Sequence, residues 1–203
     1  MSISMKSILA AAVASLVVGN AMAADGTINF KDEITAAACS ITGGAGTTVG
    51  GAAGNQTIDV SLGKISIDSL GGTAGGSIAG GTSLNLDCGK TGTGLTTVKL
   101  KFDPMSGTGI DSHNESLLKL GKDSTATGVG IGIYGSDGKL LNLSANETIN
   151  APLNSNIEKD GEGNDITVYS ANLNLRAAYV KSGAAAATAG IANGSLPFTL
   201  EYN

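Results

Sequence analysis

The chain has 203 residues, a formal net charge of −5, 31 glycines and no tryptophan. Its acidic balance, with no basic run, argues against nucleic acid and anionic membrane surfaces as partners. Because glycine breaks helices while threonine, valine and isoleucine favour strands, the composition predicts an all-β domain with many turns.

The N-terminus has the layout of a secretory signal peptide. Lys6 supplies a positive charge, residues 8–18 form an apolar run, and residues 21–23 (Ala-Met-Ala) provide a small-x-small cleavage site. We expect residues 1–23 to be removed, so that the mature chain begins at Ala24. The apolar run is short for a membrane-spanning helix, and no longer run follows, so no membrane insertion is expected. A retained membrane anchor is the alternative interpretation.

Residues 24–37, at the start of the mature chain, alternate between apolar and polar side chains. One face carries Ile28, Phe30, Asp32 and Ile34. A period of two over this length predicts a strand with one buried face.

Further strand signals follow at near-regular spacing. A Gly/Ala/Thr-rich loop is expected over residues 43–54, and strands are predicted at 58–67, 82–88 and 96–102. A hairpin is predicted over 128–143 with its turn at 135–138, followed by strands at 166–169, 172–181 and 196–202. Several short strands separated by turns are typical of an immunoglobulin-like β-sandwich.

The two cysteines, Cys39 and Cys88, fit one disulfide, because an exported chain meets an oxidising compartment. Cys88 falls on the inward face of its predicted strand, which suits a buried bridge. Closing a loop of about 50 residues would stabilise the fold by about 4 kcal/mol in the entropic model. The alternatives, a metal site or a nucleophilic thiol, lack supporting residues.

Motifs that resemble catalytic or cofactor sites lack the context that such sites need. The G-x-G-x-x-G of residues 130–135 lies within a predicted strand and before a hairpin turn, so no dinucleotide site is expected. His113, the single histidine, is flanked by Asp111 and Glu115, and this stretch fits a polar surface loop as well as a metal site. We therefore predict no enzyme, no cofactor and no metal.

Five stretches of the chain carry a likeness to a known family. They are residues 24–41 (ADGTINFKDEITAAACSI), 60–63 (VSLG), 83–88 (SLNLDC), 128–143 (GVGIGIYGSDGKLLNL) and 175–203, with tyrosine as the next-to-last residue. In order and spacing, this set resembles the type 1 fimbrial major-subunit family of chaperone–usher pilins. The likeness spans nearly the whole mature chain.

The resemblance implies an incomplete immunoglobulin-like β-sandwich, whose missing last strand is supplied by a neighbour's donor strand. It implies a donor-strand extension at residues 24–36 and a pilin domain at 37–203. The donor side chains would be Ile28, Phe30, Asp32 and Ile34. Groove and chaperone contacts are expected at Leu196, Phe198, Leu200, Tyr202 and Asn203, whose carboxylate would anchor a basic pair in the chaperone.

The implied function is that of a structural subunit of an adhesive fimbria, assembled by donor-strand exchange. The chain would be exported through the periplasm to the bacterial surface. Its expected partners are identical or related pilin subunits, a periplasmic chaperone and an outer-membrane usher. One alternative is a minor or adaptor subunit. Another is a self-contained secreted β-sandwich binding module whose N-terminal strand pairs within its own domain.

Two residues depart from the family pattern. Asp32 stands where the family usually has glycine, and a buried carboxylate without a partner is unfavourable. Pro197 removes a backbone donor from the last predicted strand, which we expect to be tolerated only where that donor would face no neighbour.

Overall fold

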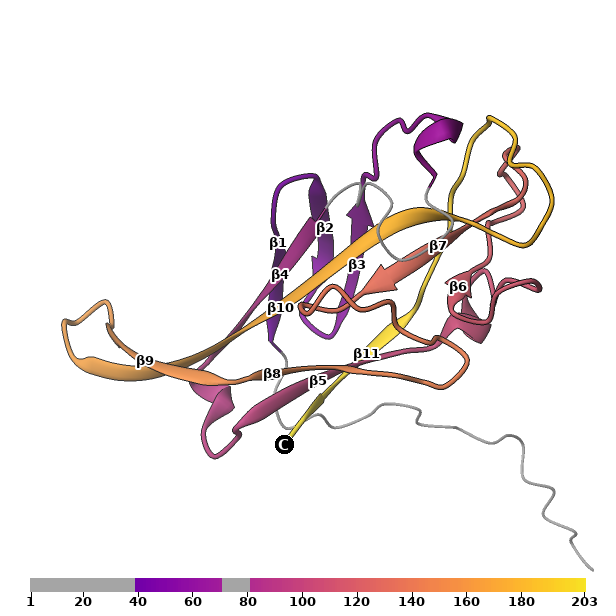
Figure 1. Cartoon of the computed structure of the whole chain (residues 1–203). Helices are drawn as coiled ribbons and strands as arrows, with labels where there is room; N and C mark the ends of the chain where they lie inside the picture. Colours follow the sequence, from indigo (N-terminus) through magenta and orange to yellow (C-terminus); the bar gives the residue numbers. More distant parts are fainter. Residues whose placement is uncertain (1–38, 71–80) are drawn as a thin grey trace, which may run out of the picture. The chain divides into compact units, whose positions relative to one another are not determined.

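The computed structural model describes residues 39–70 and 81–203, all within the compact unit Thr35–Asn203. The expected signal peptide and the predicted donor strand lie outside the described residues. The described part consists of strands joined by turns and short 3₁₀ segments (Figure 1). The strands are β1 (Ser40–Gly43), β2 (Thr47–Ala52), β3 (Asn55–Val60), β4 (Gly81–Gly89), β5 (Thr97–Phe102), β6 (Leu117–Leu118), β7 (Val129–Tyr134), β8 (Ile149–Pro152), β9 (Asn154–Lys159), β10 (Asp165–Lys181) and β11 (Phe198–Tyr202). The 3₁₀ segments are η1 (Ile67–Ser69), η2 (Lys90–Gly92) and η3 (Pro104–Ser106).

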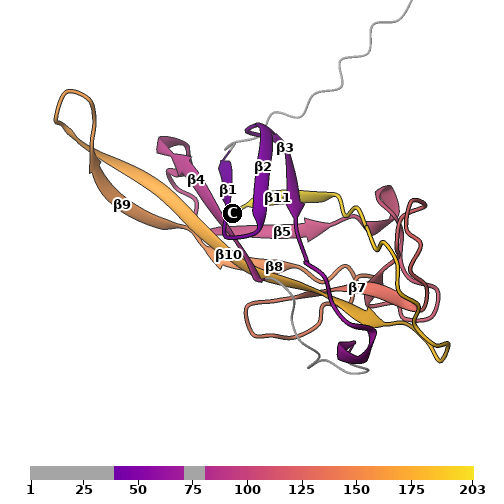
Figure 2. The same cartoon turned by 90° about the horizontal axis from the view of Figure 1, so that it is seen from above.

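The strands form two sheets and one separate ribbon (Figures 1 and 2). The larger sheet has the order β1-β4-β10-β7-β6, and β9 pairs separately with β10. The smaller sheet has the order β11-β5-β8, and β2 pairs with β3 to form the ribbon. Neighbouring strands are antiparallel, so each sheet can bury one face and leave the other to water.

One hydrophobic core lies between the two sheets. Leu86 of β4 and Leu173 of β10 face it from the larger sheet, and Val98 and Leu100 of β5 face it from the smaller one. Each of these side chains is at most 1% exposed. Because alternate residues of both sheets fill the same core, the predicted all-β sandwich is confirmed.

The loop predicted over residues 43–54 is wrong, because β2 lies inside it. Val49 of β2 stands opposite Ile58 of β3, and both side chains pack against the main core. Gly54, with φ +85°, makes the turn between the two strands. The glycine-rich segment forms a strand because it has a pairing partner and an inward apolar side chain, neither of which composition reveals.

The strands predicted at 166–169 and 172–181 are one continuous strand, β10. Its pairing register with β4 shifts between Tyr169 and Ser170, so the regular alternation breaks there. N-terminal to this point β10 pairs with β9, a strand that the sequence did not predict because all six of its residues are exposed. Together they form a ribbon that extends beyond the sandwich (Figure 1).

The hairpin predicted over 128–143 is only partly correct. Its turn forms, with the Gly138 N–H donating to the Gly135 carbonyl at 3.0 Å, but the return segment contributes only the bridge between Tyr134 and Leu140. The short strand β6 pairs with β7 at Ile131 and Gly132, so β7 is flanked there by β6 and β10. The return segment therefore has little of β7 left to pair with.

The glycines of the G-x-G-x-x-G pattern are packing residues. All six residues of β7 are buried, because β6 and the segment after the turn cover its outward face. A Cβ on Gly130 would lie 2.9 Å from the Leu117 Cβ, and one on Gly132 would lie 2.9 Å from the Leu140 Cδ1. These positions therefore have no room for a side chain, and the pattern needs no nucleotide to explain it.

Candidate functional site

The candidate site is the free edge of β11. Within the described residues, β11 pairs with β5 alone. Asn203 and Thr97 exchange both backbone hydrogen bonds, each at 2.9 Å, so they form a hydrogen-bonded pair. Because such pairs alternate along an antiparallel ladder, the N–H and C=O groups of Thr199 and Glu201 also point toward β5. Those of Phe198, Leu200 and Tyr202 point the other way, toward the free edge.

The same three residues turn their side chains inward. Phe198, Leu200 and Tyr202 are half-buried and pack against the main core, as does Leu196, which lies just before β11. The free edge therefore combines backbone groups that have no partner among the described residues with a row of incompletely covered apolar side chains. An edge of this kind is suited to pair with another strand.

Pro197 does not interrupt this edge. It directly precedes β11, and its carbonyl accepts a hydrogen bond from the Asp103 N–H at 2.8 Å, so it faces the β5 side. A backbone N–H at position 197 would point toward Asp103. From the sequence, we expected this position to face no neighbour. Asp103 lies beyond the end of β5, so the missing N–H affects only the end of the hydrogen-bond ladder between β5 and β11.

A second group of incompletely buried apolar side chains lies on β3 and the segment after it. Ile58 and Leu62 pack against the main core, Ile65 is half-buried, and Val60 and Ile67 are 37% and 40% exposed. Apolar side chains of this segment and of β11 pack against the main core, so they are candidates to cover an added strand. The strands β3 and β11 are labelled in Figure 2.

Tyr202 connects β11 with the start of β1. Burial raises the pKa of its hydroxyl, and the backbone N–H of Cys39 lies beside the hydroxyl and opposes this rise. Cys39 forms the predicted disulfide with Cys88, and both cysteines are buried. The disulfide and Tyr202 therefore fix one end of the candidate site.

The backbone oxygen of Asn203 is held within the domain. It accepts hydrogen bonds from the N–H groups of Thr96 at 2.7 Å and Thr97 at 2.9 Å. The hydroxyl of Thr96 approaches it at 3.3 Å. The predicted contact between Asn203 and a basic pair of a chaperone stays a prediction.

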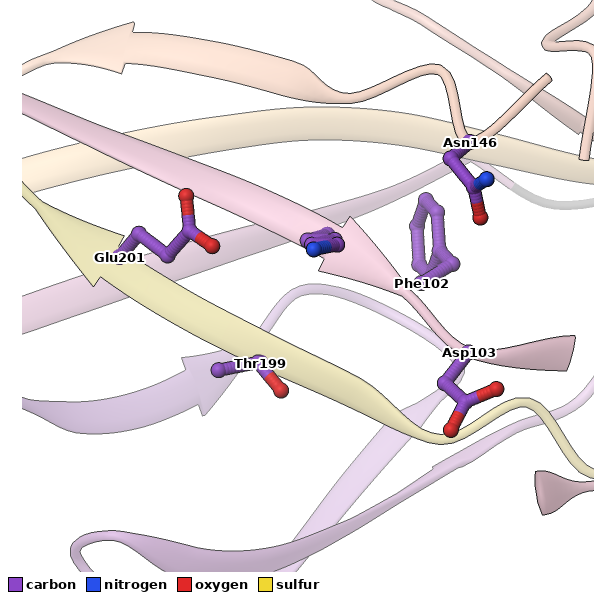
Figure 3. Close-up of a pocket in the computed structure, with 6 residues that line it drawn as sticks. Phe102, Asp103, Asn146, Thr199 and Glu201 are labelled. Carbon is purple, nitrogen blue, oxygen red and sulfur yellow. The ribbon is translucent and has the colours of Figure 1, made fainter. Parts of the chain in front are cut away.

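The outward face of β11 has a different character (Figure 3). There Lys101, Thr199 and Glu201 border a hollow of about 380 Å³, together with Phe102, Asp103 and Asn146. The Lys99 ammonium lies 3.6 Å from the Glu201 carboxylate, and the Ser106 hydroxyl and N–H lower the pKa of Asp103. Charged groups on this face contrast with the apolar inner face, so the candidate site lies on the inner side and the edge of β11.

The described residues contain no group of three or more His, Cys, Asp or Glu side chains placed to hold a metal ion. His113 and Asp111 belong to a loop in which the Asp111 carboxylate accepts hydrogen bonds from the His113 and Asn114 N–H groups. No helix among the described residues is long and apolar enough to cross a membrane.

Comparisons with known proteins identify the family. The model of the family described as "Fimbrial protein" matches residues 28–203. The chain is 32% identical over 199 residues to a type-1 fimbrial protein subunit of Serratia marcescens, covering 96% of each chain. It is 31% identical over 183 residues to the major fimbrial subunit SMF-1 of Stenotrophomonas maltophilia (strain K279a), covering 90% of this chain and 95% of that one. The chain therefore belongs to the fimbrial protein family.

A solved structure was also matched. The crystal structure of the P pilus rod subunit PapA shares 22% sequence identity with this chain, at a TM-score of 0.38. The match covers 88% of this chain and 97% of PapA.

Proposed function

We propose that this fimbrial protein is a structural pilus subunit that polymerises by donor-strand exchange. In this mechanism the free edge of β11 accepts a strand from one neighbouring subunit. Residues 24–36 of the same chain are donated as a strand to the β11 edge of another neighbour. The observation that carries the proposal is the coincidence on β11 of unpaired backbone groups and half-buried apolar side chains at Phe198, Leu200 and Tyr202.

The energetics favour a strand as the occupant of this edge. An extended segment forms main-chain hydrogen bonds along the ladder, and its alternate side chains enter the space between the sheets. Ile28, Phe30 and Ile34 are the side chains proposed to do so, and each contributes about 1.5–3 kcal/mol if fully buried. Asp32 is the exception, since its carboxylate needs a partner or access to water.

The proposal includes a route of assembly. Residues 1–23 direct export to the periplasm, where a chaperone covers the β11 edge until an outer-membrane usher delivers the next subunit. The product is a fimbrium of identical or related subunits on the cell surface. The role is structural, and we propose no catalytic activity for the chain.

Thermal unfolding tests strand donation directly. The mature chain lacking residues 24–35 is unfolded alone, with a peptide of residues 24–37, and with the same peptide carrying Phe30→Asp. We expect the native peptide to raise the melting temperature strongly and the Phe30→Asp peptide to have little effect, because the aspartate would be buried without a partner. An Asp32→Gly peptide should stabilise at least as well as the native one.

The opposite result would support the alternative interpretation of a self-contained secreted domain. If the truncated domain is already stable and monomeric, and no peptide changes its melting temperature, the chain is a self-contained secreted β-sandwich. Rescue by the native peptide leaves open whether the subunit forms the shaft or is a minor or adaptor subunit, and subunit counting in isolated fibres would decide that.

A further inference from the structure

The outer edge of β1 is closed by a side chain. The side-chain amide of Gln56, on β3, contacts the backbone of Ile41 twice. Its Nε2 donates to the Ile41 carbonyl at 3.2 Å, and its Oε1 accepts from the Ile41 N–H at 2.9 Å. A primary amide offers the same donor and acceptor as a peptide group, so Gln56 takes the place of one residue of a neighbouring strand.

The pairing of β1 with β4 shows why Ile41 needs this partner. The Gly44 N–H donates to the Ser83 carbonyl at 2.9 Å, which continues the β1–β4 register. By alternation, Thr42 is also hydrogen-bonded to β4, whereas the backbone groups of Ile41 point away from β4. Without Gln56 they would be available to another strand.

Gln56 occupies a position where the strand pattern favours an apolar residue. It is two residues from Ile58, on the same inward face of β3, and it is half-buried. The polar side chain at this position is explained by its pairing with Ile41. The Cys39 N–H, which lies just before β1 and also points outward by this alternation, lies beside the Tyr202 hydroxyl. Side chains thus meet the backbone of Ile41 within β1 and that of Cys39 just before it.

We propose that Gln56 is an edge stop, a side chain that prevents an incoming strand from pairing with β1 and so removes β1 as a competitor of β11 for strand addition. The inference rests on the proposed function and deepens it. Among the described residues, β1 is an edge strand of the larger sheet and β11 an edge strand of the smaller one, and a donor strand that paired with β1 would leave the β11 edge uncovered. Closing β1 with an amide from the same chain removes one edge that would compete with β11 for the donor strand.

The first test is hydrogen exchange in the full-length exported chain. Gln56→Met keeps an unbranched side chain of similar length and removes both hydrogen bonds. Gln56→Glu keeps only the acceptor. Thr57→Leu, at the exposed neighbouring position of β3, is the control. We expect the Ile41 amide to exchange at least ten-fold faster in Gln56→Met. In Gln56→Glu, which keeps the acceptor of the Ile41 N–H, and in the control it should exchange at the wild-type rate. An Ile41 amide that already exchanges like an exposed loop amide in the wild-type chain would overturn the proposal without any variant.

The second test measures strand addition in fibres of the same full-length chains. A fluorescent peptide of residues 24–37 is added to finished fibres, in which the β11 edges are filled along the length. We expect at least ten-fold more bound peptide per subunit in Gln56→Met fibres than in wild-type or Thr57→Leu fibres. The bound peptide should also restore slow exchange at Ile41.

The outcomes separate the edge stop from the proposed function. If the wild-type chain forms no fibres and binds no donor peptide, the proposed function fails. If wild-type and Gln56→Met fibres form normally and bind equal amounts of peptide, the edge stop alone is overturned. A Gln56→Met chain that is merely less stable, with no added peptide bound, also overturns it, since anchoring the β2–β3 ribbon would then be the whole role of Gln56.

Discussion

Replacing single backbone N–H groups of β11 by ester oxygens tests whether each N–H faces the free edge of β11 or its pairing with β5. The register with β5 assigns the Leu200 N–H to the free edge and the Glu201 N–H to the β5 ladder. An ester at Leu200 should weaken binding of the peptide of residues 24–37. It should destabilise the free domain less than an ester at Glu201, because it removes no donor from the β5 ladder and only weakens the Thr199 carbonyl as an acceptor. An ester at Glu201 should lower the stability of the domain by the loss of one ladder hydrogen bond. It should weaken peptide binding less than the Leu200 ester, because it removes no donor from the free edge and only weakens the Leu200 carbonyl as an acceptor.

The magnitude follows from one hydrogen bond in each case. A typical intramolecular hydrogen bond contributes about 0.5–1.5 kcal/mol net. Since a factor of ten in an equilibrium constant is about 1.4 kcal/mol, the Leu200 ester should weaken peptide binding by about 2- to 13-fold. The Glu201 ester should lower the free energy of unfolding by about 0.5–1.5 kcal/mol.

The assay combines urea unfolding of the truncated domain without peptide and a peptide titration under native conditions. Because β11 is close to the end of the chain, chemical ligation can introduce each ester. A Leu200 ester that destabilises the free domain as much as the Glu201 ester would refute the assignment of the free edge. Equal peptide affinity in both esters would refute pairing of the peptide with β11.

Three further predictions follow from packing, covalent structure and titration. Gly130→Ala should lower the free energy of unfolding by about 1–3 kcal/mol in urea unfolding because its Cβ would collide with β6, whereas Gly50→Ala, in β2 with open space around it, should not destabilise the domain. Replacing Cys39 and Cys88 together by alanine should lower stability by about 4 kcal/mol, for a sequence separation of 49 residues; no change in the urea midpoint would contradict this. The raised pKa of Tyr202 stabilises the fold below the unfolded tyrosine pKa of about 10, and this contribution is lost as the pH rises through the folded pKa. Alkaline unfolding should therefore move to higher pH in Tyr202→Phe, and an unchanged midpoint would contradict a buried hydroxyl.

Much of the fold could be predicted from side-chain alternation. The strands at Thr82–Cys88 and Thr96–Phe102 match β4 and β5 closely, and the inward position of Cys88 is confirmed by its disulfide with Cys39. The β2 strand could not be predicted, because its two glycines and one alanine carry no periodic signal. The β9 strand was equally hidden, since its residues are all exposed and no buried face imposes a pattern, whereas the β10 half of the same ribbon was predicted at 166–169.

The apolar face of the last strand was visible in the sequence, because Leu196, Phe198, Leu200 and Tyr202 recur at every second position. A period of two tells which face of a strand is buried, but not which of its two edges is occupied. The direction of each N–H and C=O depends on the register with a partner strand that lies far away in the sequence. Only the pairing of β11 with β5 therefore assigns the free backbone groups, and only the approach of β3 to β1 gives Gln56 its partner, Ile41.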